Sequence, residues 1–301
     1  MNWFFIALIG YLLLAVVAVL DKFIVSKSVR PIVYTFYSTI FMFGALAALP
    51  IIDFNFLIGI DWWWAIVSGV SFGFALWTLF LALNRGEASH INPFNGGLVT
   101  IFIFILSFVF LGENLTILQY FGISILVLAS FLLSFEKSLK HDGFHLGFVW
   151  AIISALFFAI SHVSAKYLYG QYDFGTAFIW TRATTGLVGL FLLLFPTVRN
   201  SFKRKEKEPK TYAKKYSLFI VISNKILSIL SAILLQYAMS IGSVTIVGAM
   251  SGVQYVLMFT MIYLLTKFTP KIFKEYFTKH EIKMQILALL LVVIGSVFFV
   301  I

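Results

Sequence analysis

The chain has 301 residues, of which 61% are hydrophobic and only 11% charged, and its mean hydropathy is +1.00. Because soluble domains carry about 25% charged residues, this composition excludes an ordinary soluble domain. The net charge of +10 is better explained by contact with lipid headgroups than by binding of nucleic acid, since the basic residues lie in short loops between apolar segments. We therefore expect a lipid bilayer and no nucleic acid as partner. The absence of Cys excludes disulfides and Cys-based metal sites.

Ten apolar segments are long enough to cross a bilayer, which takes about 20 helical residues at about 1.5 Å each. Helices are expected because lipid cannot satisfy open backbone groups. The runs are also continuous, unlike the short alternating segments of a β-barrel. In chain order, the predicted spans are residues 3–20, 32–52, 62–83, 94–111, 117–135, 144–164, 175–195, 217–237, 244–265 and 284–301.

The basic residues fall almost entirely on one side of these spans. The loops after the odd-numbered spans hold 3, 1, 2, 8 and 5 Lys and Arg residues, 19 of the 22 in the chain. By the positive-inside rule these loops are cytoplasmic and both termini lie outside. The sequence thus predicts a multi-pass protein of the cell membrane whose cytoplasmic loops include residues 22–30, 137–140, 199–215 and 267–283.

The two halves of the chain resemble each other. Residues 82–89 (ALNRGEAS) align with residues 238–245 (AMSIGSVT), and Lys22 aligns with Lys166. Because each copy holds five spans, an odd number, the second copy must enter the membrane upside down. Two inverted repeats around a site near the membrane midplane are a recurring plan of transporters. We predict an all-α membrane protein with repeats at residues 1–138 and 143–301, the second interrupted by the basic loop 199–215.

The first half carries several motifs of a known family. Residues 82–89, 92–94 (NPF), 110–116 (FLGENLT) and the apolar segment 122–130 resemble the EamA-type unit of ten-helix carriers in the drug/metabolite transporter superfamily. The second half has LLTK in place of the LGE motif, and its Arg182 stands where the family often has an Arg. The resemblance implies a cavity enclosed by spans 1–4 and 6–9, with spans 5 and 10 at the periphery. It also implies cytoplasmic termini, the reverse of the orientation that the charges predict.

Arg182 is the sharpest candidate for function. It lies about 10 Å into the seventh span by helical rise, where a buried Arg is costly unless it faces a cavity or a partner. From there it can hold a carboxylate or phosphate with two parallel hydrogen bonds. The alternative is that it extends towards Asp173 and the membrane surface.

Other polar and aromatic residues of the spans can line the same cavity or simply join helices. Amides in an apolar cavity can bind a solute, but similar groups also hold helices together. Lys225 and Asp21 can likewise have either a structural role or a role in binding. Lys225 can extend to the basic loop, and Asp21 can pair with Lys22 or with an amine of the solute. Besides Arg182, the candidate cavity residues are Asn92, Asn95, Ser251, Gln254, Trp180, Tyr37 and Lys225.

The predicted function is a secondary carrier of a small organic solute or metabolite, either monomeric or homodimeric, that works by alternating access. We expect no cofactor, since there is no P-loop or dinucleotide motif, and no metal or catalytic site, since the His residues show no ligand spacing. Residues 69–73 match the GxSxG pattern of hydrolases, but in an apolar helix close packing of Gly69 and Gly73 explains it better. Two alternatives remain, a non-transporting scaffold and an intramembrane lipid-modifying enzyme.

Overall fold

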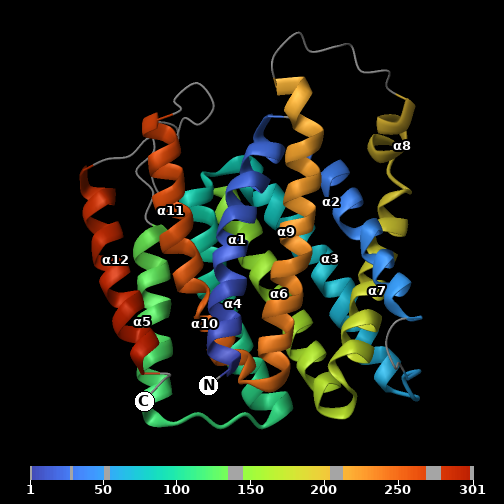
Figure 1. Cartoon of the computed structure of the whole chain (residues 1–301), viewed down its shortest axis with the longest axis horizontal. Coiled ribbons are helices and arrows are strands. Elements are labelled where there is room, and N and C mark those ends of the chain that lie inside the picture. The colour runs from blue at the N-terminus through green and yellow to red at the C-terminus, as the bar shows by residue number, and fades with distance from the viewer. Residues whose placement is uncertain are drawn as a thin grey trace.

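The computed structural model describes residues 2–27, 30–50, 55–134, 145–203, 213–268 and 279–298. Within these ranges the chain is a bundle of roughly parallel helices with no β-strand (Figure 1). The elements are α1 (Asn2–Lys27), α2 (Pro31–Ile40), the 3-10 helix η1 (Phe41–Ala48), α3 (Asp61–Arg85), α4 (Ala88–Leu111), α5 (Ile117–Ser134), α6 (Leu146–Gln171), α7 (Phe174–Leu192), α8 (Pro196–Lys203), α9 (Ala213–Ile241), α10 (Val244–Ala249), α11 (Ser251–Phe268) and α12 (Lys279–Val297).

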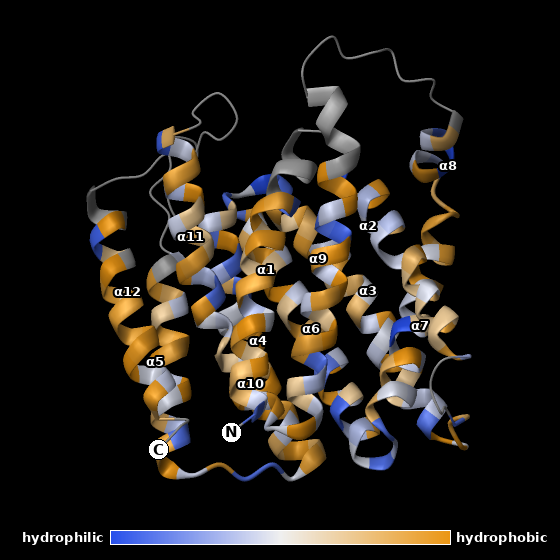
Figure 2. Ribbon diagram, in the orientation of Figure 1, coloured by the Kyte–Doolittle hydropathy of each residue, from blue (hydrophilic) through white to orange (hydrophobic). Residues whose placement is uncertain are grey.

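Seven helical segments in the described part of the chain are long and apolar enough to cross a membrane. The pair α7 and α8 passes the same test only when the two helices are taken together, and they are bent by 90° relative to each other. The apolar parts of α5 and α12, Ile117–Leu132 and Ile282–Val297, are shorter. Most helices are apolar along their length, with polar residues gathered towards their ends (Figure 2). The protein is therefore an all-helical, multi-pass membrane protein.

Several helices begin or end away from the predicted boundaries. Helix α4 starts at Ala88 and not at residue 94, so Pro93 lies inside the helix. The seventh span ends early because Pro196, which starts α8, restricts the backbone of the preceding residue. The ninth span is broken at Met250 into α10 and α11.

Helices α3 and α7 pack closely through small residues. A methyl group added at Gly69 would collide with the side chain of Thr184 and with the α7 backbone, and one at Gly73 would collide with Val188. The hydroxyl of Thr184 donates to the carbonyl of Ala65 across the interface, at 2.7 Å. The glycines of the GxSxG match therefore serve helix packing, as expected.

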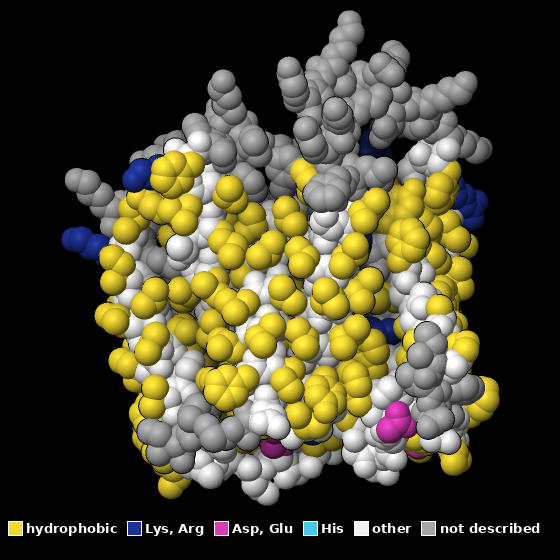
Figure 3. All heavy atoms as spheres, viewed as in Figure 1, with side chains coloured by type: hydrophobic (Ala, Val, Ile, Leu, Met, Phe, Trp, Pro, Cys, Tyr) yellow, Lys and Arg dark blue, Asp and Glu magenta, His cyan; other side chains and the backbone are white. Residues whose placement is uncertain are grey.

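Helix α1 begins and α12 ends at the same end of the bundle (Figure 1). Helices α1, α3, α5, α8 and α11 end at the opposite end of the bundle, which we call the basic end (Figure 1). In the surface view, Lys and Arg side chains gather towards this end and the acidic side chains towards the end that holds the termini (Figure 3). We call the latter the terminal end.

Candidate functional site

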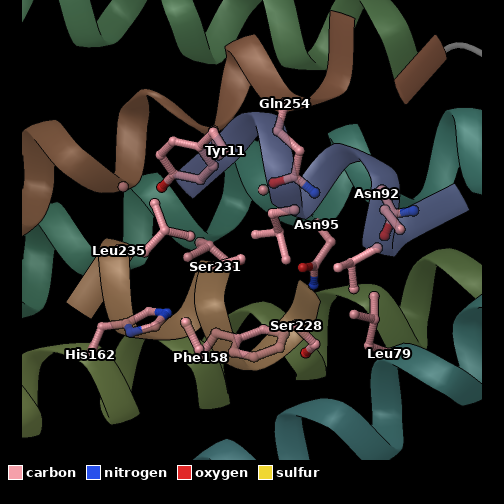
Figure 4. A pocket seen from close by; sticks show the side chains of 18 of the residues that line it. Tyr11, Leu79, Asn92, Asn95, Phe158, His162, Ser228, Ser231, Leu235 and Gln254 are labelled. Carbon is pink, nitrogen blue, oxygen red and sulfur yellow. The ribbon is translucent and has the colours of Figure 1, made fainter. Parts of the chain in front are cut away.

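A cavity of about 200 Å³ lies at the centre of the bundle. Helices α1, α3 and α4 line it from the first half of the chain, and α6, α7, α9, α10 and α11 from the second. Its described lining includes no residue of α5 or α12, which pack against each other. Figure 4 shows Tyr11 and Gln254 on one side of the cavity, His162 and Phe158 on the other, and Asn95 and Ser231 between them.

Arg182 lines this cavity from the middle of α7. Its side chain is only 2% exposed, and none of the three guanidinium nitrogens has a hydrogen-bond partner among the described residues. The guanidinium carbon lies 4.2 Å from the ring centre of Phe72 and 5.5 Å from that of Phe178. Arg182 does not extend to Asp173, whose carboxylate caps α7 by accepting from Thr176. These rings supply cation–π contacts but no hydrogen-bond acceptor, so the donors of Arg182 remain available.

A relay of neutral polar groups crosses the same side of the cavity. The hydroxyl of Tyr169 donates to Oε1 of Gln236 at 2.9 Å, and Nε2 of Gln236 lies 3.0 Å from Nδ1 of His162. The imidazole also stacks on Phe158, with ring centres 6.1 Å apart. His162 and Gln236 both line the cavity. They add hydrogen-bonding groups beside Arg182 without adding a carboxylate.

The amides and the hydroxyl chosen from the sequence also reach the cavity. Asn92, Asn95, Ser251 and Gln254 all line it. Asn95 uses its amide nitrogen to donate to the carbonyl of Ala151 on α6, at 2.8 Å, and Asn92 lies 3.4 Å from the sulfur of Met258. Gln254, in contrast, makes no hydrogen bond to another described residue. Its amide is free to contact a bound solute.

Three candidates from the sequence lie outside the cavity lining. Tyr37 packs among the rings of Phe36, Phe41 and Phe202 near the basic end. Trp180 packs against Trp62, and its indole nitrogen donates to the carbonyl of Asn55. In the structure both residues serve packing between helices and loops.

Lys225 is the third of these candidates. Its ammonium group donates to the hydroxyl of Ser38 at 2.7 Å and lies 4.2 Å from the ring centre of Tyr34. It is thus held by α2, away from the central lining, and does not extend to the basic loop.

A polar cluster joins α1, α2 and α9 at the cavity wall. Asp21 lines the cavity, and its Oδ1 accepts hydrogen bonds from the hydroxyl of Tyr34 and, at 2.7 Å, from Nδ2 of Asn224. The same Nδ2 lies 3.0 Å from the Tyr34 hydroxyl oxygen. Oδ1 of Asn224 is buried and has no partner among the described residues. The sequence indicated Asp21 but not the two donors that surround it.

Nearer the terminal end, Lys166 fastens the last turn of α9. Its ammonium group donates to the carbonyls of Met239, Ser240 and Gly242, at 2.8 to 3.1 Å. These carbonyls carry the partial negative charge of the helix end. The side chain of Lys22, the matching residue of the first repeat, lies outside the described part of the chain.

Glu113 of the LGE motif binds the other half of the chain. Its carboxylate accepts from the hydroxyl of Thr245 in the first turn of α10, which also contacts Ser107 at 2.8 Å. A carboxylate is favourable at a helix N-terminus. Helix α5, directly after the motif, is capped instead by Thr116 and Gln119, each of which accepts from the backbone N–H of the other.

Comparisons with known proteins agree with this architecture. A solved crystal structure matches 99% of this chain and 98% of its own, with a TM-score of 0.67 and 17% sequence identity. At this identity the likeness shows the fold alone. No curated protein matches the sequence. The model of the EamA-like transporter family matches residues 1–135. The expected resemblance to the EamA-type unit is thereby confirmed over these residues.

Proposed function

We propose that this protein is a secondary carrier of small organic anions, with Arg182 as the residue that binds the anionic group. The observation that carries the proposal is a cation that is 2% exposed, lines a central cavity and has no hydrogen-bond partner among the described residues. Membrane proteins seldom retain such a group without a functional reason, because it is costly in the bilayer. A carboxylate or phosphate matches its parallel N–H donors.

The rest of the lining defines the solute. Its walls are mostly apolar, with the amides of Asn95 and Gln254 and the hydroxyls of Ser231 and Ser251 at intervals. This combination of an apolar pocket with a few oriented polar groups is typical of binding sites for small molecules. A cavity of about 200 Å³ suits a solute the size of a metabolite.

The proposed mechanism is alternating access between two inverted repeats of five spans, at residues 1–138 and 143–301. Seven long apolar segments, one bent pair and two shorter apolar helices match the ten predicted spans in order, which supports this count. Contacts between the halves, such as those of Glu113 with Thr245 and Asp21 with Asn224, would break and form again as one half rocks against the other. The carrier acts in the cell membrane as a monomer or homodimer, with its basic loops in the cytoplasm.

Transport by the reconstituted protein tests this proposal. Liposomes containing wild-type protein would be incubated with a mixture of metabolites, and their contents measured by mass spectrometry. We expect accumulation of one or more organic anions by the wild type and not by Arg182→Ala, with both proteins reconstituted in equal amounts. If neither protein moves any solute and the wild type instead retains a partner protein on purification, the chain is a scaffold and the proposal is wrong.

A further inference from the structure

Asp21 and Arg182 are opposite charges in the cavity lining, and their balance affects whether an anion can bind alone or only together with a proton. Among the described residues, Asp21 is the only acidic and Arg182 the only Lys or Arg side chain in the lining. The formal charge of the empty lining is therefore zero, with His162 neutral. A bound monoanion would leave a net charge of −1 in a largely apolar enclosure, where an uncompensated charge is costly.

The surroundings of Asp21 are built from neutral donors and not from an ion pair. Oδ1 accepts from Tyr34 and Asn224, and no Lys or Arg in the described part lies within salt-bridge distance of the carboxylate. Lys225, the nearby cation, is occupied by the hydroxyl of Ser38 and the ring of Tyr34. Such a carboxylate can lose its charge without leaving a bonded cation unpaired.

One acceptor of this cluster, Oδ1 of Asn224, has no hydrogen-bond donor among the described residues. Nδ2 of Asn224 lies within hydrogen-bonding distance of Asp21 and Tyr34, while Oδ1 of the same amide is buried without a donor. A buried acceptor without a donor destabilises the folded state. Asn224 is fully buried and does not belong to the cavity lining, so a solute in the cavity is poorly placed to supply the donor. A proton on Asp21, whose Oδ1 already contacts Nδ2 of the same amide at 2.7 Å, would add one donor to this cluster.

We propose that Asp21, with Tyr34 and Asn224, is a proton-binding site in the cavity wall, and that the bound proton travels with the anion held by Arg182. The second part rests on the proposed function. The proton comes from water on the side to which the cavity opens, attaches to a carboxylate oxygen of Asp21 and returns to water on the other side. Empty and loaded cavities then both carry no net charge, so the carrier moves one monoanion with one proton.

Other titratable groups around Asp21 define the controls. Among the described residues, α3 and α4 contribute none to the cavity lining. His90 on α4 lies 3.8 Å from Glu87, outside the lining. The groups on the remaining elements are Tyr11 on α1, Tyr34 on α2, His162 on α6, Arg182 on α7, Lys225 on α9 and Tyr255 on α11. None of these is a carboxyl group, so an infrared signal from a protonated carboxylic acid distinguishes Asp21 from all of them.

Infrared difference spectra of the reconstituted protein, recorded between alkaline and acidic buffer, test the proton site without any solute. Every carboxyl group that takes up a proton adds to the carbonyl band on acidification, so the test is the component that each variant loses. We expect Asp21→Asn to lose one component that Asp61→Asn keeps. Asp61 is the matched control, because its carboxylate also accepts from a tyrosine hydroxyl, that of Tyr172, but lies outside the cavity lining. In Asn224→Leu the band should persist at a shifted frequency, since the acid loses a hydrogen-bond partner.

If Asp21→Asn does not fold, the frequency shift in Asn224→Leu still tests whether the acid band comes from Asp21. A band that is the same in Asp21→Asn as in the wild type, or one that does not move in Asn224→Leu, would overturn the proton site.

Coupling is tested in the same sample with a series of monocarboxylates, acetate, hexanoate and phenylacetate, at constant pH. Any of them that raises the melting temperature of the wild type but not of Arg182→Ala should also increase the Asp21 acid band. An anion that binds through Arg182 and leaves the band unchanged would overturn coupling. If none binds, the anion site of the proposed function fails, while the acid band still decides the proton site by itself.

Discussion

Arg182 should reduce the stability of the protein when no solute is bound. Burying an Arg near the centre of a membrane helix costs about 2.5–3.5 kcal/mol. The contact with the ring of Phe72, at 4.2 Å, returns about 0.5–2 kcal/mol, and there is no hydrogen bond to a described residue to offset the rest. Arg182→Met keeps the length of the side chain and removes the charge. We expect it to raise the free energy of unfolding by about 0.5–3 kcal/mol.

Thermal unfolding in detergent, followed by tryptophan fluorescence, measures this effect as a rise of a few degrees in melting temperature. The control is Arg199→Met, because Arg199 is exposed and donates to the carbonyl of Leu193 at the bend before α8. Substitution of an exposed residue should change stability by no more than about 0.5 kcal/mol. A loss of stability of about 1 kcal/mol or more in Arg182→Met would refute the reasoning and make Arg182 a structural residue.

Three further predictions concern packing and the helix ends. Gly69→Ala should lower the free energy of unfolding by about 1–3 kcal/mol, because the added methyl group overpacks the contact between α3 and α7. Gly170→Ala is the control, because a methyl group there meets no atom within 4 Å. The melting temperature should fall in the first variant and not in the second. Lys166→Met should cost about 1.5–3 kcal/mol by the same measurement, since three carbonyls lose a charged donor, and no loss would mean that water replaces it. The hydroxyl of Tyr172 donates to the Asp61 carboxylate, and this hydrogen bond raises the pKa of Tyr172. The hydrogen bond stabilises the folded protein below the pKa of tyrosine in the unfolded chain, about 10, and this stabilisation is lost as the pH rises through the raised pKa of Tyr172 in the folded protein. The melting temperature of Tyr172→Phe should therefore fall less at alkaline pH than that of the wild type.

The sequence was informative about helices and about charge. Continuous apolar runs predict membrane helices because the bilayer leaves the backbone no other partner, and nearly all of the structured spans fall on those runs. Arg182 was identifiable because a cation within an apolar run stands out against its surroundings. The amides at Asn92, Asn95 and Gln254 were identifiable for the same reason, and the structure brings all of them to one cavity.

The direction in which each helix faces could not be predicted as well. Both the lipid and the interior of the bundle are apolar, so the helices lack the strong contrast between faces that marks an amphipathic helix. Tyr37 and Trp180 were therefore chosen as lining residues, although they pack near the ends of the bundle. Tyr11, Ser231 and Gln236, which do line the cavity, were missed because nothing in the sequence separates them from other polar residues of the spans.

Ligand binding to the purified protein tests the central claim most directly, namely that Arg182 forms an anion site in the cavity. A thermal-shift screen against a metabolite library would be run with wild type and Arg182→Ala side by side. A ligand at 100 times its Kd stabilises a protein by about 2.7 kcal/mol, which such a screen detects readily. We predict that organic anions stabilise the wild type and not the variant. Stabilisation of both proteins by the same anion, or of neither by any, would contradict the claim.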